Sequence, residues 1–135
     1  MADVIDLDRL PCTDHQGCRV VDGHRFRRCL TYRDESVTTA QAVGLTDVVW
    51  TVTVATQQGG AELLTSAATT NWAITGIYVE DAAAGQFAVN IAEGDVALLG
   101  IGQHWYTVHA AFPADHTQLP ALARTILQGR LVVTA

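Results

Sequence analysis

The sequence predicts an all-β domain in which two antiparallel sheets pack face to face as a sandwich. Three observations predict this fold. Several segments alternate apolar and polar side chains with the period of two that half-buried strands show. Clusters of Gly, Pro and Asp separate these segments at the short spacing typical of a sandwich. The chain of 135 residues has the length of one domain, and no segment predicts a helix longer than two turns.

The clearest alternation lies in the second half of the chain. In segments 48–55 and 86–91, large apolar side chains occupy every second position, with mostly polar residues between them. Such a pattern buries one face of a strand and leaves the other exposed. Segments 103–110 and 125–134 are predicted to be further strands. The residues expected in the core are Trp50, Val52, Phe87, Val89, Ile91, Val108 and Leu131.

Glycines mark the predicted turns. The run 57–60 contains two glycines and predicts a turn into a short returning strand, because glycine reaches positive φ at little cost. Asp22 and Gly23 predict a hairpin turn between two N-terminal strands. Segment 71–79 is predicted to be a strand with a bulge or break at Gly76. Between the later strands, Glu93 to Gly100 is compatible with one turn of helix, in which Leu98 or Leu99 would close one end of the sandwich.

The N-terminus lacks this alternation. Residues 1–17 are expected to form an extended arm, and the sandwich is expected to occupy 18–135. Leaving apolar side chains of the arm in water would cost free energy. We therefore expect the arm to become ordered against a neighbouring subunit. The apolar residues concerned are Val4, Ile5, Leu7 and Leu10.

Charge is sparse and unevenly distributed. The formal net charge is −6, and all eight basic residues are arginine. An acidic domain repels phosphate backbones, so we expect no nucleic-acid partner. Residues 38–135 carry nine charged side chains, seven acidic and two arginines, which favours burial against partner subunits. Thr, Gln and Asn could also solvate such a surface without charge.

No targeting or membrane segment is expected. The apolar runs are too short to cross a bilayer, so we expect no membrane association. The chain opens with acidic residues instead of the basic and apolar regions of a secretory signal peptide.

Motifs for catalysis are not found in the sequence. Neither serine, Ser36 or Ser66, lies in a Gly-x-Ser-x-Gly motif, and no phosphate-binding glycine pattern occurs. His104 and His109 fall on opposite faces of one predicted strand, where they cannot easily share a metal ion. Asp95 is interpreted as a helix N-cap in a solvated turn. We therefore predict a protein that is not an enzyme, with no catalytic residue and no cofactor.

One cluster of potential metal ligands stands out. All three cysteines and two of the five histidines fall within eighteen residues, and zinc favours four such ligands. The spacing matches no zinc motif known to us, so we expect no bound metal. A disulfide between Cys12 and Cys18, or three free thiols, are the alternatives; an odd count leaves at least one thiol outside any intrachain bridge. The candidate ligands are Cys12, His15, Cys18, His24 and Cys29.

The three tryptophans allow two interpretations. Trp50, Trp72 and Trp105 could line a carbohydrate-binding face, or they could pack between the sheets as strand tryptophans in sandwiches do. Trp50 is predicted to be in the core. Trp105 remains open, because Tyr106 and Val108 compete with it for the inward face.

The order of segments from Val48 to Ala135 resembles the small immunoglobulin-like domains of tailed-bacteriophage virion proteins. The nearest type is the N-terminal domain of phage baseplate upper proteins. The N-terminal residues that carry the Cys and His cluster have no counterpart in this resemblance. The matching segments are the strand 50–54, the strand 85–91 after a small-residue loop, the step from 95–99 into 102–108, and the final Gly-x-Leu-x-Val strand within 127–133.

The resemblance implies an immunoglobulin-like sandwich and a non-enzymatic structural role in the tail, baseplate or capsid of a phage particle. The protein would act through interfaces with other virion proteins and with copies of itself. It would be assembled in the host cytoplasm and located in the virion. A reducing cytoplasm favours free thiols. The alternative function is a carbohydrate-binding or host-adhesion module that uses surface tryptophans.

Overall fold

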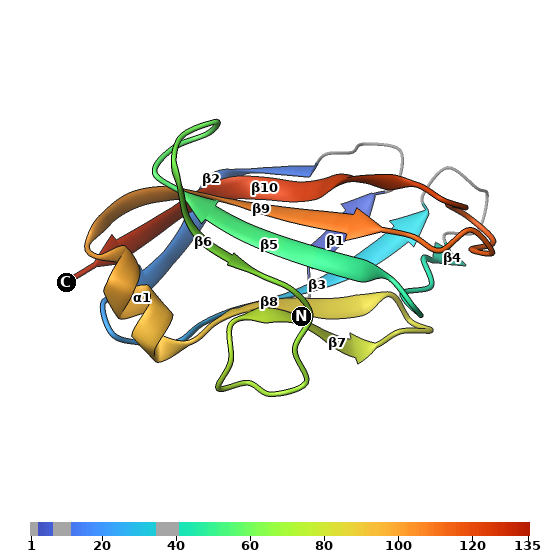
Figure 1. Cartoon of the computed structure of the whole chain (residues 1–135), viewed down its shortest axis with the longest axis horizontal. Coiled ribbons are helices and arrows are strands. Elements are labelled where there is room, and N and C mark those ends of the chain that lie inside the picture. Colours follow the sequence, from blue (N-terminus) through green and yellow to red (C-terminus); the bar gives the residue numbers. More distant parts are fainter. Residues whose placement is uncertain (1–2, 7–11, 35–40) are drawn as a thin grey trace.

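The computed structural model describes residues 3–6, 12–34 and 41–135, and the side chains of 18–33 and 41–135. These ranges form two stacked β-sheets, which confirms the predicted all-β sandwich (Figure 1). Sheet A contains β1 (Asp3–Asp6), β3 (Phe26–Asp34), β4 (Gln41–Ala42), β7 (Gly76–Asp81) and β8 (Gln86–Ile91). Sheet B contains β2 (Cys12–Val21), β5 (Val49–Ala55), β6 (Glu62–Ser66), β9 (Gly102–Ala111) and β10 (Ala123–Thr134).

The strand order defines which strands lie at the edges of each sheet. Sheet A runs β1-β3-β8-β7, with β4 paired to β3, and sheet B runs β2-β10-β9-β5-β6. The turn predicted at 57–60 joins β5 to β6 as an antiparallel hairpin. The predicted strands at 48–55, 86–91, 103–110 and 125–134 all exist, with bounds shifted by no more than two residues.

The core lies between the two sheets. Along β9, buried side chains alternate with half-exposed ones from His104 to Ala110, as the period of two requires. Burying a large apolar side chain contributes roughly 1.5–3 kcal/mol, so the repeated inward positions hold the sheets together. The residues predicted for the core are all buried, which confirms that prediction: Trp50, Val52, Phe87, Val89, Ile91, Val108 and Leu131.

The N-terminal segment is not an arm. Residues 3–6 form β1, which pairs with β3, and residues 12–21 form β2, which pairs with β10; both pairings are parallel. The predicted boundary at residue 17 therefore falls inside a strand, and the N-terminal strands are edge strands of the two sheets. The prediction was wrong because pairing at a sheet edge depends on backbone hydrogen bonds. Any sequence can form these bonds, so a segment without alternating side chains can still become a strand. Of the expected apolar arm residues, Leu7 and Leu10 lie outside the described residues.

Two further local predictions need correction. Asp22 and Gly23 do form a turn, with Gly23 at φ +75°, but β2 and β3 belong to different sheets, so this turn crosses the sandwich and joins no hairpin. The predicted strand 71–79 begins only at Gly76. The preceding residues form a loop in which the Asn71 side chain accepts a hydrogen bond from the backbone N–H of Ala73.

A short helix, α1 (Glu93–Leu99), connects sheet A to sheet B. Val96 is its buried residue, whereas Leu98 is 84% exposed and closes nothing; Leu99 packs partly against the core. Asp95 does not cap the helix. The helix begins after Ala92 without a side-chain cap, and the Asp95 carboxylate instead accepts a hydrogen bond from the Thr75 hydroxyl.

No helix in the described residues has the length and apolar character needed to cross a membrane.

Candidate functional site

The cysteines and histidines of the N-terminal cluster do not converge where their side chains are described. Cys18 lies on β2 between the sheets, where its sulfur is 3.3 Å from Arg28 Nη1. Cys29 lies on β3 and contacts Glu80 on β7, with its thiol donating to Glu80 Oε1 at 3.1 Å. His24 is exposed in the turn that crosses the sandwich. Cys12 and His15 lie on β2, but their side chains are outside the described residues.

The strand pleat explains this separation. Along β3 the side chains of Phe26, Arg28 and Leu30 face the interior, so the position of Cys29 between them faces outward. Among the side chains that the structure describes, no three of the His, Cys, Asp and Glu type gather as metal ligands would. For Cys18, His24 and Cys29, whose side chains are described, closeness in sequence therefore did not become closeness in space.

The Cys29 thiol is held in its neutral form. Burial raises its pKa above the ordinary value of 9.0, and Glu80 raises it further as a hydrogen-bond acceptor and as a negative charge. Arg27 acts in the opposite direction. Because the thiolate is the reactive form of cysteine, this environment disfavours a nucleophilic role.

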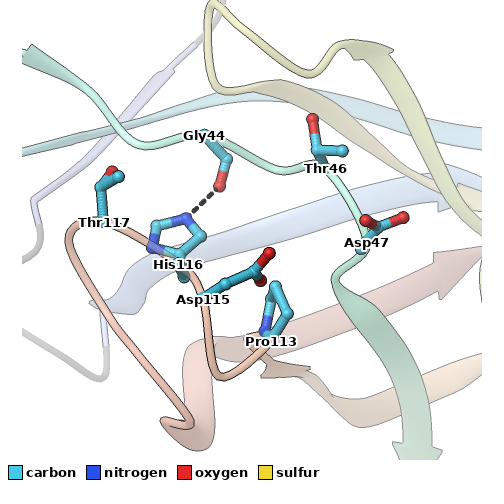
Figure 2. Close-up of a pocket in the computed structure, with 7 residues that line it drawn as sticks. All are labelled: Gly44, Thr46, Asp47, Pro113, Asp115, His116 and Thr117. Carbon is cyan, nitrogen blue, oxygen red and sulfur yellow. Dashed lines mark hydrogen bonds between the residues drawn. The ribbon is translucent and has the colours of Figure 1, made fainter.

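A hollow of about 220 Å³ lies where the loop between β9 and β10 meets the segment before β5 (Figure 2). His116 occupies its centre. The His116 Nδ1 accepts hydrogen bonds from the backbone N–H groups of Gln118, at 3.1 Å, and Leu119, at 2.9 Å. The ring must then carry its proton on Nε2, which donates to the Gly44 carbonyl at 2.6 Å. Both nitrogens are committed, so His116 fastens a loop and offers no free base.

Gln118 strengthens the same attachment. Its amide oxygen accepts from the Gly44 N–H at 3.3 Å, and its amide nitrogen donates to the Ala42 carbonyl at 3.0 Å. Asp47 and Asp115 also line the hollow; Figure 2 shows Asp115 next to His116 and Asp47 on the opposite side, near Thr46, and draws no hydrogen bond from either carboxylate. The hollow is therefore a structural contact in which hydrogen bonds hold the loop between β9 and β10 against the segment before β5.

Trp72 forms an aromatic stack on the outer side of sheet A. The Arg27 guanidinium lies 3.7 Å from the centre of the indole, and the Tyr78 ring stacks at 3.9 Å with planes only 13° apart. Two groups this close cannot share one face of a ring, so Trp72 is held between them. Asn90 donates to the Trp72 carbonyl at 3.0 Å and so fixes the loop on the sheet. This cluster was not predicted, because its members come from β3, β7 and a loop.

The other two tryptophans have opposite surroundings. Trp50 is buried and lies 4.9 Å from Phe87 between ring centres, which confirms its predicted core position. Trp105 faces outward from β9 and is half-exposed, while Tyr106 and Val108 take inward positions. The strand register, which the sequence left open, thus leaves Trp105 on the surface of sheet B.

Several large apolar side chains are exposed on the described surface. Leu98 on α1 and Ile101 just beyond it are 84% and 62% exposed, and they are three positions apart. Single exposed apolar residues are common, but two so close in the sequence at the end of a helix make this end of α1 a candidate contact surface. The others are Val21, Val49, Leu63 and Ile74.

Comparisons with known proteins give a likeness of fold. No family model matches the chain, and no curated protein matches it. Among solved structures, the chain is similar to the N-terminal domain of phage TP901-1 ORF48, with a TM-score of 0.50 and 9% sequence identity. The match covers 99% of this chain and 98% of that domain. The two therefore share a fold that includes the N-terminal strands, which the resemblance starting at Val48 did not cover.

Proposed function

We propose that this protein is a non-enzymatic structural component of a tailed-phage particle that acts through interfaces with other virion proteins and with copies of itself. The observation that carries the proposal is the correspondence of fold over nearly the whole chain with a domain of a phage protein. The resemblance of the segments from Val48 onward to baseplate upper proteins supports the same class. The proposal covers a position in the tail, the baseplate or the capsid.

The surface of the sandwich supports a role in assembly. Sheet B ends at β6, a strand of five residues whose Leu63 is exposed. Isolated sandwich proteins commonly block such edges with lysine, and this chain contains none. Leu98 and Ile101 add an exposed apolar surface at α1 that a neighbouring subunit can cover.

The proposal is tested by incorporation of the protein into particles. Leu98→Glu combined with Ile101→Glu should leave the isolated domain folded, because both side chains are already in water, and should reduce the amount of protein in purified particles. Ala114→Glu, an exposed residue in the loop after β9, is the matched control. Mass spectrometry of purified particles measures the incorporation.

The outcomes test the structural role in the particle and the α1 contact surface separately. Absence of the wild-type protein from the particles would contradict the structural role. Equal incorporation of the double variant and the control would show that the α1 surface is not the interface, and the β6 edge would then be tested by Leu63→Lys.

A further inference from the structure

The outer face of sheet B carries rows of polar side chains around Trp105. In the strand register, Trp105 on β9 lies between Ala55 on β5 and Arg130 on β10. The neighbouring row places Thr107 between Thr53 and Gln128. Thr53 continues this row to Thr65 on β6, with the two hydroxyl oxygens 3.4 Å apart. The face is thus polar and has few charges, with one large aromatic side chain.

A hollow of about 260 Å³ opens beside Trp105 on this face. The register accounts for it, because Ala55 fills little of the space next to the indole. The hairpin between β5 and β6 forms the opposite side, where Gln58 and Glu62 line the hollow. Small-molecule binding sites usually have volumes of about 300 Å³ or more. This hollow is slightly smaller, so it suits a ligand about the size of one sugar ring.

The polar groups around the hollow define the ligand chemistry. The Glu62 carboxylate accepts a hydrogen bond from Thr65 through Oε1, and its second oxygen has no partner among the described residues. The indole N–H of Trp105 is shielded from solvent, so Trp105 offers the hollow its ring face and not this donor. No cationic side chain lines the hollow, and one carboxylate does. The site therefore disfavours anions and phosphate. The amide, hydroxyl and carboxylate groups that line it can exchange several hydrogen bonds with a ligand rich in hydroxyl groups.

We propose that this hollow is a binding site for a neutral saccharide. One apolar face of the sugar ring would pack on the Trp105 indole, since an aromatic surface offers a large contact area with a polar edge. Sugar hydroxyls would donate to Glu62 and exchange hydrogen bonds with Gln58 and with the threonines beside them. The proposal goes beyond the structural role in a particle and does not depend on it.

The test uses the full chain, labelled with ¹⁵N, and the indole N–H resonances of the three tryptophans. The probes are glucose, galactose, rhamnose and N-acetylglucosamine, each as the monomer and as a short oligomer. We expect at least one probe to shift the Trp105 resonance saturably while the Trp50 and Trp72 resonances stay in place. Trp50 is buried and Trp72 lies in the loop that packs on the outer side of sheet A, so they act as internal controls.

Two variants locate the site. Glu62→Gln should weaken binding about tenfold, the usual loss for one hydrogen bond to a charged group. Ala55→Leu should abolish binding by filling the hollow, and circular dichroism reports whether this variant folds. Glu93→Gln, which removes an exposed carboxylate on α1, should bind like the wild type. The isosteric Glu62 variant keeps the test valid if Ala55→Leu fails to fold.

Three results would overturn the proposal. The first is that no probe shifts Trp105 saturably at any concentration up to its solubility. The second is that Glu62→Gln binds the active probe as tightly as the wild type does. The third is that Trp105 responds only when another protein of the particle is added, which would make the hollow a protein interface.

Discussion

Arg28 and Tyr106 join the two sheets by a hydrogen bond of 2.8 Å from the guanidinium to the phenol oxygen. Arg28 lies on β3 of sheet A, and Tyr106 lies on β9 of sheet B with its side chain fully buried. The same guanidinium nitrogen is 3.3 Å from the Cys18 sulfur on β2. An arginine that faces the interior thus connects strands that are far apart in the sequence.

Replacing Arg28 by Met should lower the free energy of unfolding by about 2 kcal/mol, because Tyr106 loses a charged donor in a half-buried setting. Urea unfolding measures the change. Arg130→Met, at an exposed position on β10, should stay within about 0.5 kcal/mol of the wild type. A double-mutant cycle with Tyr106→Phe should give a coupling energy above about 0.5 kcal/mol. Additive effects of the two substitutions would show that the bond contributes nothing.

Gly85 and Gly23 form a matched pair for a second prediction. Both have positive φ, at +70° and +75°, but a side chain at Gly85 would collide with the Tyr32 carbonyl, whereas Gly23 has open space around it. Gly23→Ala should cost about 1 kcal/mol for the left-handed backbone alone. Gly85→Ala should cost about 3 kcal/mol, because backbone strain and overpacking add. Equal thermal shifts for the two variants would contradict the close approach of Gly85 to the Tyr32 carbonyl.

His116 is predicted to hold the loop between β9 and β10 in place. His116→Ala removes the acceptor for the Gln118 and Leu119 amides and the donor to Gly44, which should cost about 2 kcal/mol. Hydrogen exchange of the Leu119 amide should become faster, while exchange in β9 stays unchanged. His109→Ala, at a half-exposed outward position, is the control. Unchanged protection of Leu119 in the His116 variant would refute this role.

The reactivity of Cys29 should depend on Glu80. Burial and then Glu80 raise the pKa of the Cys29 thiol, so Glu80→Gln should lower that pKa and speed alkylation severalfold near pH 8. Mass spectrometry of the peptide that contains Cys29 measures the rate separately from the other cysteines. Glu93→Gln should leave the rate unchanged. A rate that does not respond to Glu80→Gln would show that the 3.1 Å hydrogen bond is absent in solution.

The same shift predicts a pH dependence of stability. A thiol whose pKa is raised in the folded state contributes stability that is fully present below the unfolded value, taken as 9.0, and is lost as the pH rises through the folded pKa. The free energy of unfolding should therefore fall as the pH rises above about 9. Cys29→Ser should remove this part of the decline.

Local patterns predicted much of the sheet and little of the pairing. The alternation in β5 identified buried residues correctly, because the pleat decides inward and outward positions within one strand. In β8 the large apolar residues are buried as predicted, but Ala88 and Asn90, which the alternation placed on an exposed face, are buried as well. In β3 the same rule applies, and it places the charged Arg28 between Phe26 and Leu30 on the interior face. Its partner Tyr106 is 78 positions away, and no local sequence pattern predicts such a contact.

The fold class, most of the core strands and the glycine turn after β5 follow from local patterns in the chain, since these features depend on the period of side chains and on the conformational freedom of glycine. Packing between distant strands, in contrast, places β1 and β2 in opposite sheets, gives Cys18 and Cys29 different surroundings, and puts Trp105 beside a hollow above Ala55. These features arise from hydrogen bonds and registers between distant strands. The energies that select one such pairing over another come from the whole packed sandwich, so no single segment of the chain encodes them.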